Sequence, residues 1–400
     1  MTTSTDISSR SALFQLGFRP LFLVAMLFAT LAMALWMVDL LIGISPLPAT
    51  RSPVVWHAHE MIYGYSLAVI AGFLLTAVRN WTGEPTVTGL PLKLLLLIWV
   101  VARAAPFVPD PYGMWLMLVA DNLFIVALSV ALTIPVVRAK RWKSLPVVST
   151  IHLFLVGNML FDLGVTGYLD DGVPLGISLG LYLVLYLMLL LARRVMPMFI
   201  GRGTALPCKP RNFPWVDRSA PLLFLGFVLL DILTEWRQLT ALFALLLALV
   251  HAVRLVGWCP RPIWGAIWSR ALLWVLVLAY GWLIAGFLLT AGSAIGWYSP
   301  SLALHALAVG GIGMMTMGMM ARVAWGHSGR DLQSPPAQLA LLFALLAVSG
   351  VVRVVVPALL PASYVVWIGL SQLLWITAFA GLLFCYVPVL WQPRVDGKPG

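Results

Sequence analysis

The amino-acid sequence predicts an all-α fold, a polytopic membrane helical bundle of about 12 transmembrane helices with both termini cytoplasmic. Of the 400 residues, 62% are hydrophobic and only 10% are charged, whereas a soluble domain is roughly half apolar and a quarter charged. Because a soluble fold could not bury this much apolar surface, the bilayer must be the solvent for most of the chain. The apolar residues also fall into runs that short polar loops separate.

Twelve apolar runs are long enough to cross a membrane, which takes about 20 residues of helix. In order along the chain, we predict spans at residues 19–43, 57–78, 92–109, 113–137, 146–168, 173–192, 219–235, 238–257, 270–292, 301–321, 337–357 and 363–387. They form a single transmembrane helical domain at residues 19–390, between cytoplasmic tails at residues 1–18 and 391–400.

The charges in the loops orient this bundle. Four basic residues follow the fourth span: Arg138, Lys140, Arg141 and Lys143. Cytoplasmic loops of membrane proteins are enriched in Lys and Arg, so this loop is predicted to lie inside. Alternation then places every strongly basic loop on the same side, including the one predicted from Arg193 to Arg218. The net charge of +11 therefore reflects membrane orientation, and we expect no nucleic-acid partner.

One heptapeptide occurs twice, at residues 71–77 and 285–291. The predicted topology runs the two copies in opposite directions. An inverted repeat of the kind found in transporters explains the match. Chance explains it equally well, because such residues are common in membrane helices and no longer match surrounds them.

The six histidines sort by depth into two groups of three. Ionisable side chains within membrane spans are costly and usually functional. The outer group is His57, His59 and His305, and the inner group is His152, His251 and His327. The sequence therefore offers one set of imidazoles toward each face of the membrane.

The outer group gives the sharper signal. His57 and His59 are two residues apart, so on a regular helix their side chains diverge by about 200°. They therefore cannot easily bind the same metal ion. Glu60 shares a helical face with His57 and is predicted to orient that imidazole as a supporting carboxylate. A zinc-protease HExxH motif is excluded, because Tyr63 stands where the second histidine is needed.

Haem iron takes axial imidazoles from facing helices. We predict His59 and His305 as this pair, with His57 as the alternative partner or as a copper ligand. Imidazole suits iron and copper alike, so the ligand type does not fix the metal. Against this stands the interpretation of all three as interfacial histidines with ordinary hydrogen bonds. That ordinary interpretation is preferred for His152 and His251.

Other residues of the spans have two interpretations each. Gly310, Gly311 and Gly313 admit either a neighbouring helix or a flat porphyrin, and the methionines that follow them serve either as packing or as Cu(I) ligands. Arg103 and Asp121 either pair with each other, or Arg103 meets a haem propionate. The three cysteines, Cys208, Cys259 and Cys385, show no CxxC spacing, so a haem would be of the non-covalent b type.

Taken together, these segments resemble the NnrS family of bacterial membrane proteins. The resemblance covers nearly the whole chain. It is carried by Gly17 to Pro20, Trp56 to Met61 with Gly64, Gly72 to Ala77 with Asn80 and Trp81, and then His305, Gly310, Gly313, Met320, Arg322 and Gly326 to Arg330. The two histidine-containing segments are its specific part.

The resemblance implies a haem- and copper-containing protein of the bacterial inner (cytoplasmic) membrane that is linked to nitric oxide stress and denitrification. It carries over His57, His59, His305 and His327 as metal ligands. The cofactors it implies are haem b and copper, and the partners are nitric oxide or another small apolar ligand, the lipid bilayer and an electron donor that the sequence does not identify. No catalytic residue follows from it. Relatives often carry a histidine near Val277, which this chain lacks.

Three functions compete at this stage. The first is redox chemistry on nitric oxide or its iron adducts at a buried metal. The second is a transporter or channel for copper or a small solute, which would depend on membrane charges such as Asp121 or Asp162. The third is a nitric oxide sensor, which the absence of an obvious soluble output domain disfavours.

Overall fold

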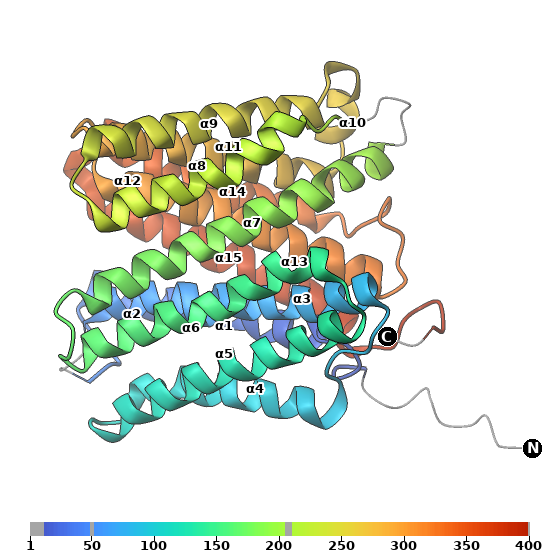
Figure 1. Cartoon of the computed structure of the whole chain (residues 1–400), viewed down its shortest axis with the longest axis horizontal. Helices are drawn as coiled ribbons and strands as arrows, with labels where there is room; N and C mark the ends of the chain where they lie inside the picture. The colour runs from blue at the N-terminus through green and yellow to red at the C-terminus, as the bar shows by residue number, and fades with distance from the viewer. Residues whose placement is uncertain (1–11, 49–51, 205–209, 399–400) are drawn as a thin grey trace, which may run out of the picture.

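The protein is a bundle of long, roughly antiparallel helices (Figure 1). Its computed structural model describes residues 12–48, 52–204 and 210–398, and these contain helices and no strands. Cys208 and most of the predicted N-terminal tail lie outside the described residues. The fold class predicted from the sequence is confirmed.

Each of the twelve predicted spans coincides with a helix or with a series of helical segments. The long helices are α1 (Phe18–Ile42), α3 (Leu67–Thr82), α4 (Gly89–Ala104), α5 (Tyr112–Arg138), α6 (Leu145–Val165), α7 (Gly172–Thr204), α8 (Pro214–Leu233), α9 (Arg237–Trp258), α11 (Ala271–Ala294), α13 (Met314–His327), α14 (Gln338–Leu359) and α15 (Tyr364–Trp391). Shorter helices are α2 (Pro53–His59), α10 (Trp264–Trp268) and α12 (Pro300–His305), and two π-helices are η1 (Glu60–Ser66) and η5 (Ala306–Gly313).

Eleven of these helical spans, among the described residues, are long and apolar enough to cross a membrane. The remaining predicted span, the seventh in the chain, is α8, which carries Asp217, Arg218 and Asp231. Asp217 contacts Arg193 at 2.7 Å and Arg254 at 3.1 Å. Charged side chains in membrane helices normally pair in this way.

The outer surface of the bundle is apolar. Large side chains such as Leu222, Val256 and Phe384 are exposed by 70%, 72% and 84%. A soluble protein rarely leaves so much apolar surface in water, so lipid is the natural solvent for these faces. The protein is a multi-pass membrane protein.

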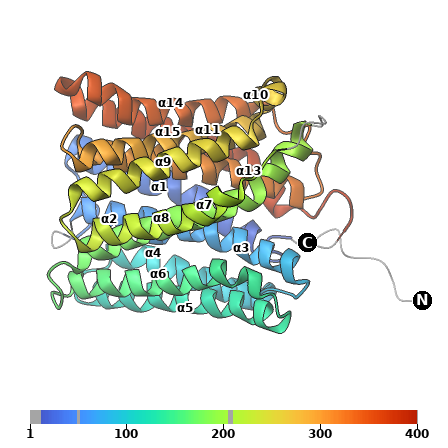
Figure 2. The ribbon, with the colours of Figure 1, turned by 45° about the horizontal axis from the view of Figure 1, so that its top comes forward.

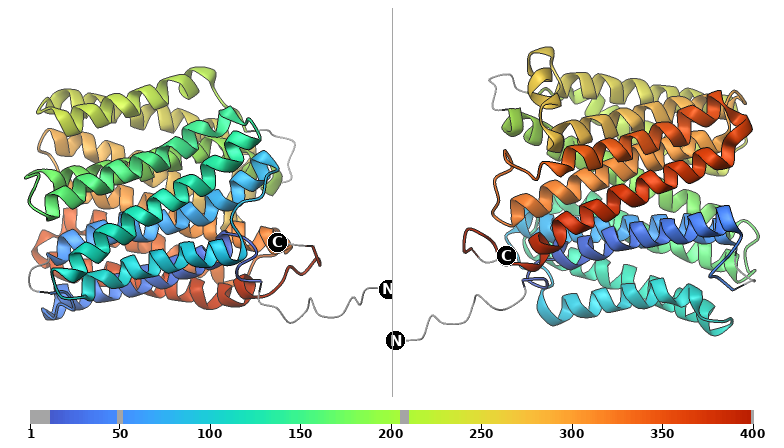
Figure 3. Two further views of the ribbon diagram at one scale, coloured as in Figure 1. Left: turned by 60° about the horizontal axis from the view of Figure 1, so that its bottom comes forward. Right: turned by 180° about the vertical axis from the view of Figure 1, so that it is seen from behind.

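Both ends of the described chain lie at one end of the bundle (Figures 1 and 3). The backbone amide of Ala12 donates to the carbonyl of Trp391 at 3.0 Å. The buried Arg19 guanidinium donates to three carbonyls at the C-terminal end of α15, at 2.7 to 3.3 Å. Arg394 donates to the carbonyl of His327 at 2.9 Å. These contacts join both terminal segments to the turn after α13.

Glycines let α6 and α7 cross closely, side by side in Figure 2. A Cβ atom on Gly172 would lie 2.5 Å from the backbone nitrogen of Gly164. Small residues at helix crossings are the usual way for membrane helices to gain van der Waals contact. The two copies of the repeated heptapeptide lie in α3 and α11, which run in opposite directions along the bundle.

Helix α7 differs from its prediction at its C-terminal end. It continues to Thr204, whereas the span was predicted to end at residue 192. Arg193 is held by Asp217, and the Arg194 guanidinium lies 3.9 Å from the ring centre of Trp81. Because both charges have partners on neighbouring helices, the helix extends through the predicted loop.

Candidate functional site

Two of the spans that carry histidines share an unusual construction. Each begins with a serine whose hydroxyl accepts a backbone N–H bond, Ser52 before α2 and Ser299 before α12, followed by a proline. Each short α-helix then gives way to a π-helix directly after a histidine, at His59 and at His305. π-Helical turns are rare and often mark functional sites. The sequence did not predict them.

A cavity of about 420 Å³ lies between these two spans, α1, α7, α14 and α15 in the outer half of the bundle, and we call it the site cavity. Its volume is within the range of about 300–1,000 Å³ of small-molecule and cofactor sites. Its polar lining residues are His57, Tyr65, Ser66, Ser301, His305, Ser349, Arg353, Tyr364, Ser371 and Gln372. Most of the remaining lining is apolar or aromatic and includes Trp36 and Trp375.

The partners of His305 fix its tautomer. Its Nδ1 lies 2.7 Å from the carbonyl oxygen of Ser301, which only accepts, so Nδ1 carries the hydrogen. Its Nε2 lies 3.2 Å from Nη2 of Arg353, which only donates, so Nε2 carries the lone pair. Metal-binding histidines commonly donate their other N–H to a carbonyl in this way. In this structure the guanidinium occupies the lone pair that a metal ion would use.

His57 lies on the same cavity. Its ring stacks on Trp36, with ring centres 5.2 Å apart and planes at 13°. Its Nδ1 is buried and has no hydrogen-bond partner among the described residues. The same holds for Nη1 of Arg353 and for both amide atoms of Gln372. Buried polar atoms are rarely left unpaired, so these atoms mark a place where a polar or metal-containing group fits.

His59 does not line this cavity. Its Nε2 lies 3.0 Å from Oδ1 of Asn158, and its Nδ1 lies 3.2 Å from Glu60. The Asn158 amide nitrogen is used toward Asn122 and Asp162, so Oδ1 is an acceptor. Both ring nitrogens of His59 therefore face acceptors, and neither directs a lone pair at a metal. The structure does not bring the predicted pair of His59 and His305 together on the site cavity. It places the alternative partner, His57, on the same cavity as His305.

Glu60 and Arg103 form a buried ionic network beside His59. Arg103 forms short ion pairs with Glu60 and with Asp121, and all three side chains are buried. The predicted pairing of Arg103 with Asp121 is confirmed. Glu60 supports His59, whereas the sequence argument gave it to His57, because Arg103 holds one carboxylate oxygen of Glu60 and the other oxygen reaches the adjacent His59 ring.

Gly64 makes room for this network. A Cβ atom at this position would lie 2.8 Å from Nη1 of Arg103 and 2.9 Å from Oε2 of Glu60. Glycines at positions 310, 311 and 313 act similarly for neighbouring helices, since Cβ atoms there would meet Trp282, Leu283 and Trp375. The space beside these three glycines is therefore filled by side chains of neighbouring helices.

The inner histidines are separate from one another. His152 is exposed and bonds a carbonyl of its own helix. His251 is buried and bonds the hydroxyl of Tyr280 at 2.6 Å. His327 ends α13, with its ring 5.9 Å from that of Phe18, at the opposite end of the bundle from the site cavity. Among the described residues, no cluster of three or more His, Cys, Asp or Glu could hold a metal ion by itself.

Arg353 was missed at the sequence level. It is the charged residue of α14, a 22-residue helix of mainly apolar side chains. A lone charge within a span is a recognised signal of function, so the sequence did hold the information. Gln372, Trp36 and Tyr364 carry no comparable signal, because amide and aromatic residues are common in membrane helices.

Comparison with known proteins identifies a family for the chain. The family model described as NnrS protein matches residues 12–394. No curated protein matches the chain. The match includes every residue that lines the site cavity and every member of the ionic network.

Proposed function

Because the chain belongs to the NnrS family and is thus a nitric-oxide-related membrane protein, we propose that it binds haem b and copper in the bacterial inner membrane and carries out redox chemistry on nitric oxide or its iron adducts. The observation that carries this proposal is the pair of imidazoles, His57 and His305, on one cavity. Both side chains line the site cavity, although they come from spans that are almost 250 residues apart in the sequence.

The residues of the site cavity fit a metal-containing cofactor. His57 and His305 come from different spans, and their imidazoles would hold the metal once Arg353 moved away from Nε2 of His305. Arg353 carries an unpartnered buried Nη1 that suits an anionic group such as a propionate. When bound, the metal would supply the redox chemistry and the site of attack on nitric oxide.

The surrounding chain has three tasks in this proposal. The Ser301 carbonyl holds His305 in the tautomer whose lone pair faces the cavity. Trp36 holds the plane of the His57 ring by stacking. The aromatic walls, which include Trp375, keep water away from the cavity, so that an uncharged ligand such as nitric oxide can reach it from lipid.

Haem and metal analysis of the purified protein tests the proposal. We expect a b-type reduced-minus-oxidised spectrum that is lost in His57→Ala and in His305→Ala. His152→Ala is the matched control, because this histidine is exposed on α6, and it should keep the full spectrum. His59→Ala should keep the metal group but lose thermal stability. A colourless, metal-free wild-type preparation would overturn the proposal.

Transport of copper or a small solute is the alternative function. A polar cavity of about 380 Å³, lined by Asp231, Glu235 and Arg237 among others, shares Leu181 and Leu304 with the site cavity and so favours passage of a polar solute. Against it, the charges on which the sequence argument relied are engaged elsewhere: Asp121 pairs with Arg103, and Asp162 bonds asparagines. Uptake into proteoliposomes that survives loss of both cavity histidines would favour transport.

A further inference from the structure

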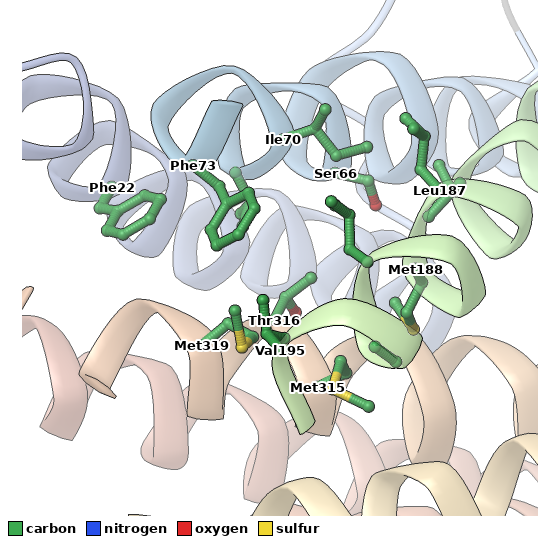
Figure 4. Close-up of a pocket in the computed structure, with 14 residues that line it drawn as sticks. Phe22, Ser66, Ile70, Phe73, Leu187, Met188, Val195, Met315, Thr316 and Met319 are labelled. Atoms are coloured by element: carbon green, nitrogen blue, oxygen red, sulfur yellow. The ribbon is translucent and has the colours of Figure 1, made fainter. Parts of the chain in front are cut away.

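A third cavity, of about 60 Å³, lies near the middle of the bundle between α1, α3, α7 and α13 (Figure 4), and we call it the apolar slot. Its lining residues are Phe22, Ser66, Val69, Ile70, Phe73, Val184, Leu187, Met188, Leu191, Ala192, Val195, Met315, Thr316 and Met319. Only two of these side chains carry hydroxyls, and both are used by backbone carbonyls. Ser66 donates to Met61 at 2.7 Å, and Thr316 donates to Ile312 at 2.6 Å.

The slot reaches the lipid-facing surface. Phe73 and Leu191 are its half-buried lining residues, and the others are buried. The segments that form it are the central parts of the spans at Pro53–Thr82, Gly172–Thr204 and Pro300–His327. The half-buried side chains of the slot therefore lie at a depth where they would meet the hydrocarbon of the bilayer.

The slot also adjoins the site cavity. Ser66 lines both. Tyr65 lines the site cavity, and its hydroxyl lies 2.6 Å from the hydroxyl of Thr316, which lines the slot. Since Thr316 donates to its own helix, Tyr65 donates to Thr316. Ser66 and the hydrogen bond between Tyr65 and Thr316 therefore connect the linings of the two cavities.

The size and chemistry of the slot limit what it can hold. An apolar cavity of about 150 Å³ stays dry and binds benzene or xenon, so a slot less than half that size suits a diatomic molecule or a noble-gas atom. A lipid or isoprenoid chain is too large for it. The flexible thioethers of Met188, Met315 and Met319 can shift to let a small apolar molecule pass.

We propose that the apolar slot takes small uncharged molecules from the bilayer core and delivers them to the site cavity past Ser66 and the Tyr65–Thr316 hydrogen bond. The identity of the delivered molecule as nitric oxide rests on the proposed function. The inference that the slot binds small apolar molecules does not rest on the proposed function, because any small apolar probe should enter it.

The test combines a metal-independent probe with a rate measurement. Crystals of the protein under xenon pressure should show xenon in the slot, and Val195→Phe should remove it. In the reduced protein, rebinding of nitric oxide after photolysis should slow by about tenfold in Val195→Phe, which is equivalent to about 1.4 kcal/mol of added barrier. The matched control is Val256→Phe on the lipid-facing surface of α9, which should leave both measurements unchanged. Ala192→Leu narrows the slot with less added volume, in case Val195→Phe misfolds.

The outcomes separate the two proposals. A metal-free protein with xenon in the slot would overturn the proposed function and leave the slot as an apolar-ligand site. Absence of xenon from the wild-type slot would overturn the route whether or not metal is bound. Xenon binding with an unchanged rebinding rate in Val195→Phe would show a closed cavity and also overturn the route.

Discussion

Replacing Arg103 by methionine removes the guanidinium that pairs with both Glu60 and Asp121 inside the membrane domain. The three side chains are exposed by 5% or less, so water cannot take over the lost contacts. Removing one partner of a buried ion pair costs about 3–5 kcal/mol, because the remaining charge is left uncompensated. Here two carboxylates lose their partner, so we expect a cost near the upper end of this range.

Thermal unfolding of the detergent-solubilised protein measures this cost. At about 1–2 °C per kcal/mol for a chain of this length, the apparent Tm of Arg103→Met should fall by about 5–10 °C. The matched control is Arg237→Met. Its ion pair with Glu235 has side chains exposed by 71% and 91%, and such a surface pair contributes less than about 1 kcal/mol.

A triple variant tests the explanation itself. Combining Arg103→Met with Glu60→Gln and Asp121→Asn removes the charges together, which is often far less costly than removing one of them. The triple variant should therefore recover much of the lost Tm. An Arg103→Met variant no less stable than Arg237→Met, or a triple variant less stable than the single one, would refute the network as the cause. Selective loss of haem from Arg103→Met at unchanged stability would instead support a propionate contact.

Two further predictions follow from local packing and burial. Gly64→Ala should destabilise the protein by about 1–3 kcal/mol through overpacking, because its Cβ would lie within 2.9 Å of Arg103, Glu60 and Phe28; Gly281→Ala, where no atom lies within 4 Å, should be neutral in the same thermal assay. Burial raises the pKa of the Cys259 thiol to about 12, so at pH 8 only about one thiol in ten thousand is the reactive thiolate. In a variant that keeps only this cysteine, a maleimide should label the folded protein far more slowly than the detergent-denatured protein, and equal rates would contradict the burial.

The number and order of the spans could be predicted because they depend on run length and loop charge, which are local properties. The end of α7 could not, because the partners of Arg193 and Arg194 lie on α8 and α3, far away in sequence. A pair of arginines after an apolar run looks like a loop until those partners are known. Residues 205–209, which follow α7, lie outside the described part of the chain.

The sequence argument was correct that His57 and His59 must face different directions, since this follows from helix geometry. Which of them faces His305 depends on how the helix is rotated within the bundle. That rotation is set by the stacking of His57 on Trp36 and by the hydrogen bond that His59 donates to Asn158, and neither contact has a local signature. The metal ligands predicted at His57, His59, His305 and His327, with haem b and copper as cofactors, stay predictions.

The two π-helices also restrict how the chain can vary in length. Adding or removing one residue in a helix rotates the part that follows by about 100° relative to the part before it and shifts it by about 1.5 Å along the axis. A relative lacking a single residue between Glu60 and Ser66 would either rotate His57 off the Trp36 face or drag Tyr65 away from Thr316. Insertions and deletions should therefore be absent from these two segments, even where the loops between helices differ in length. The number of residues in each π-helix is then as strongly constrained as the identity of the histidine before it.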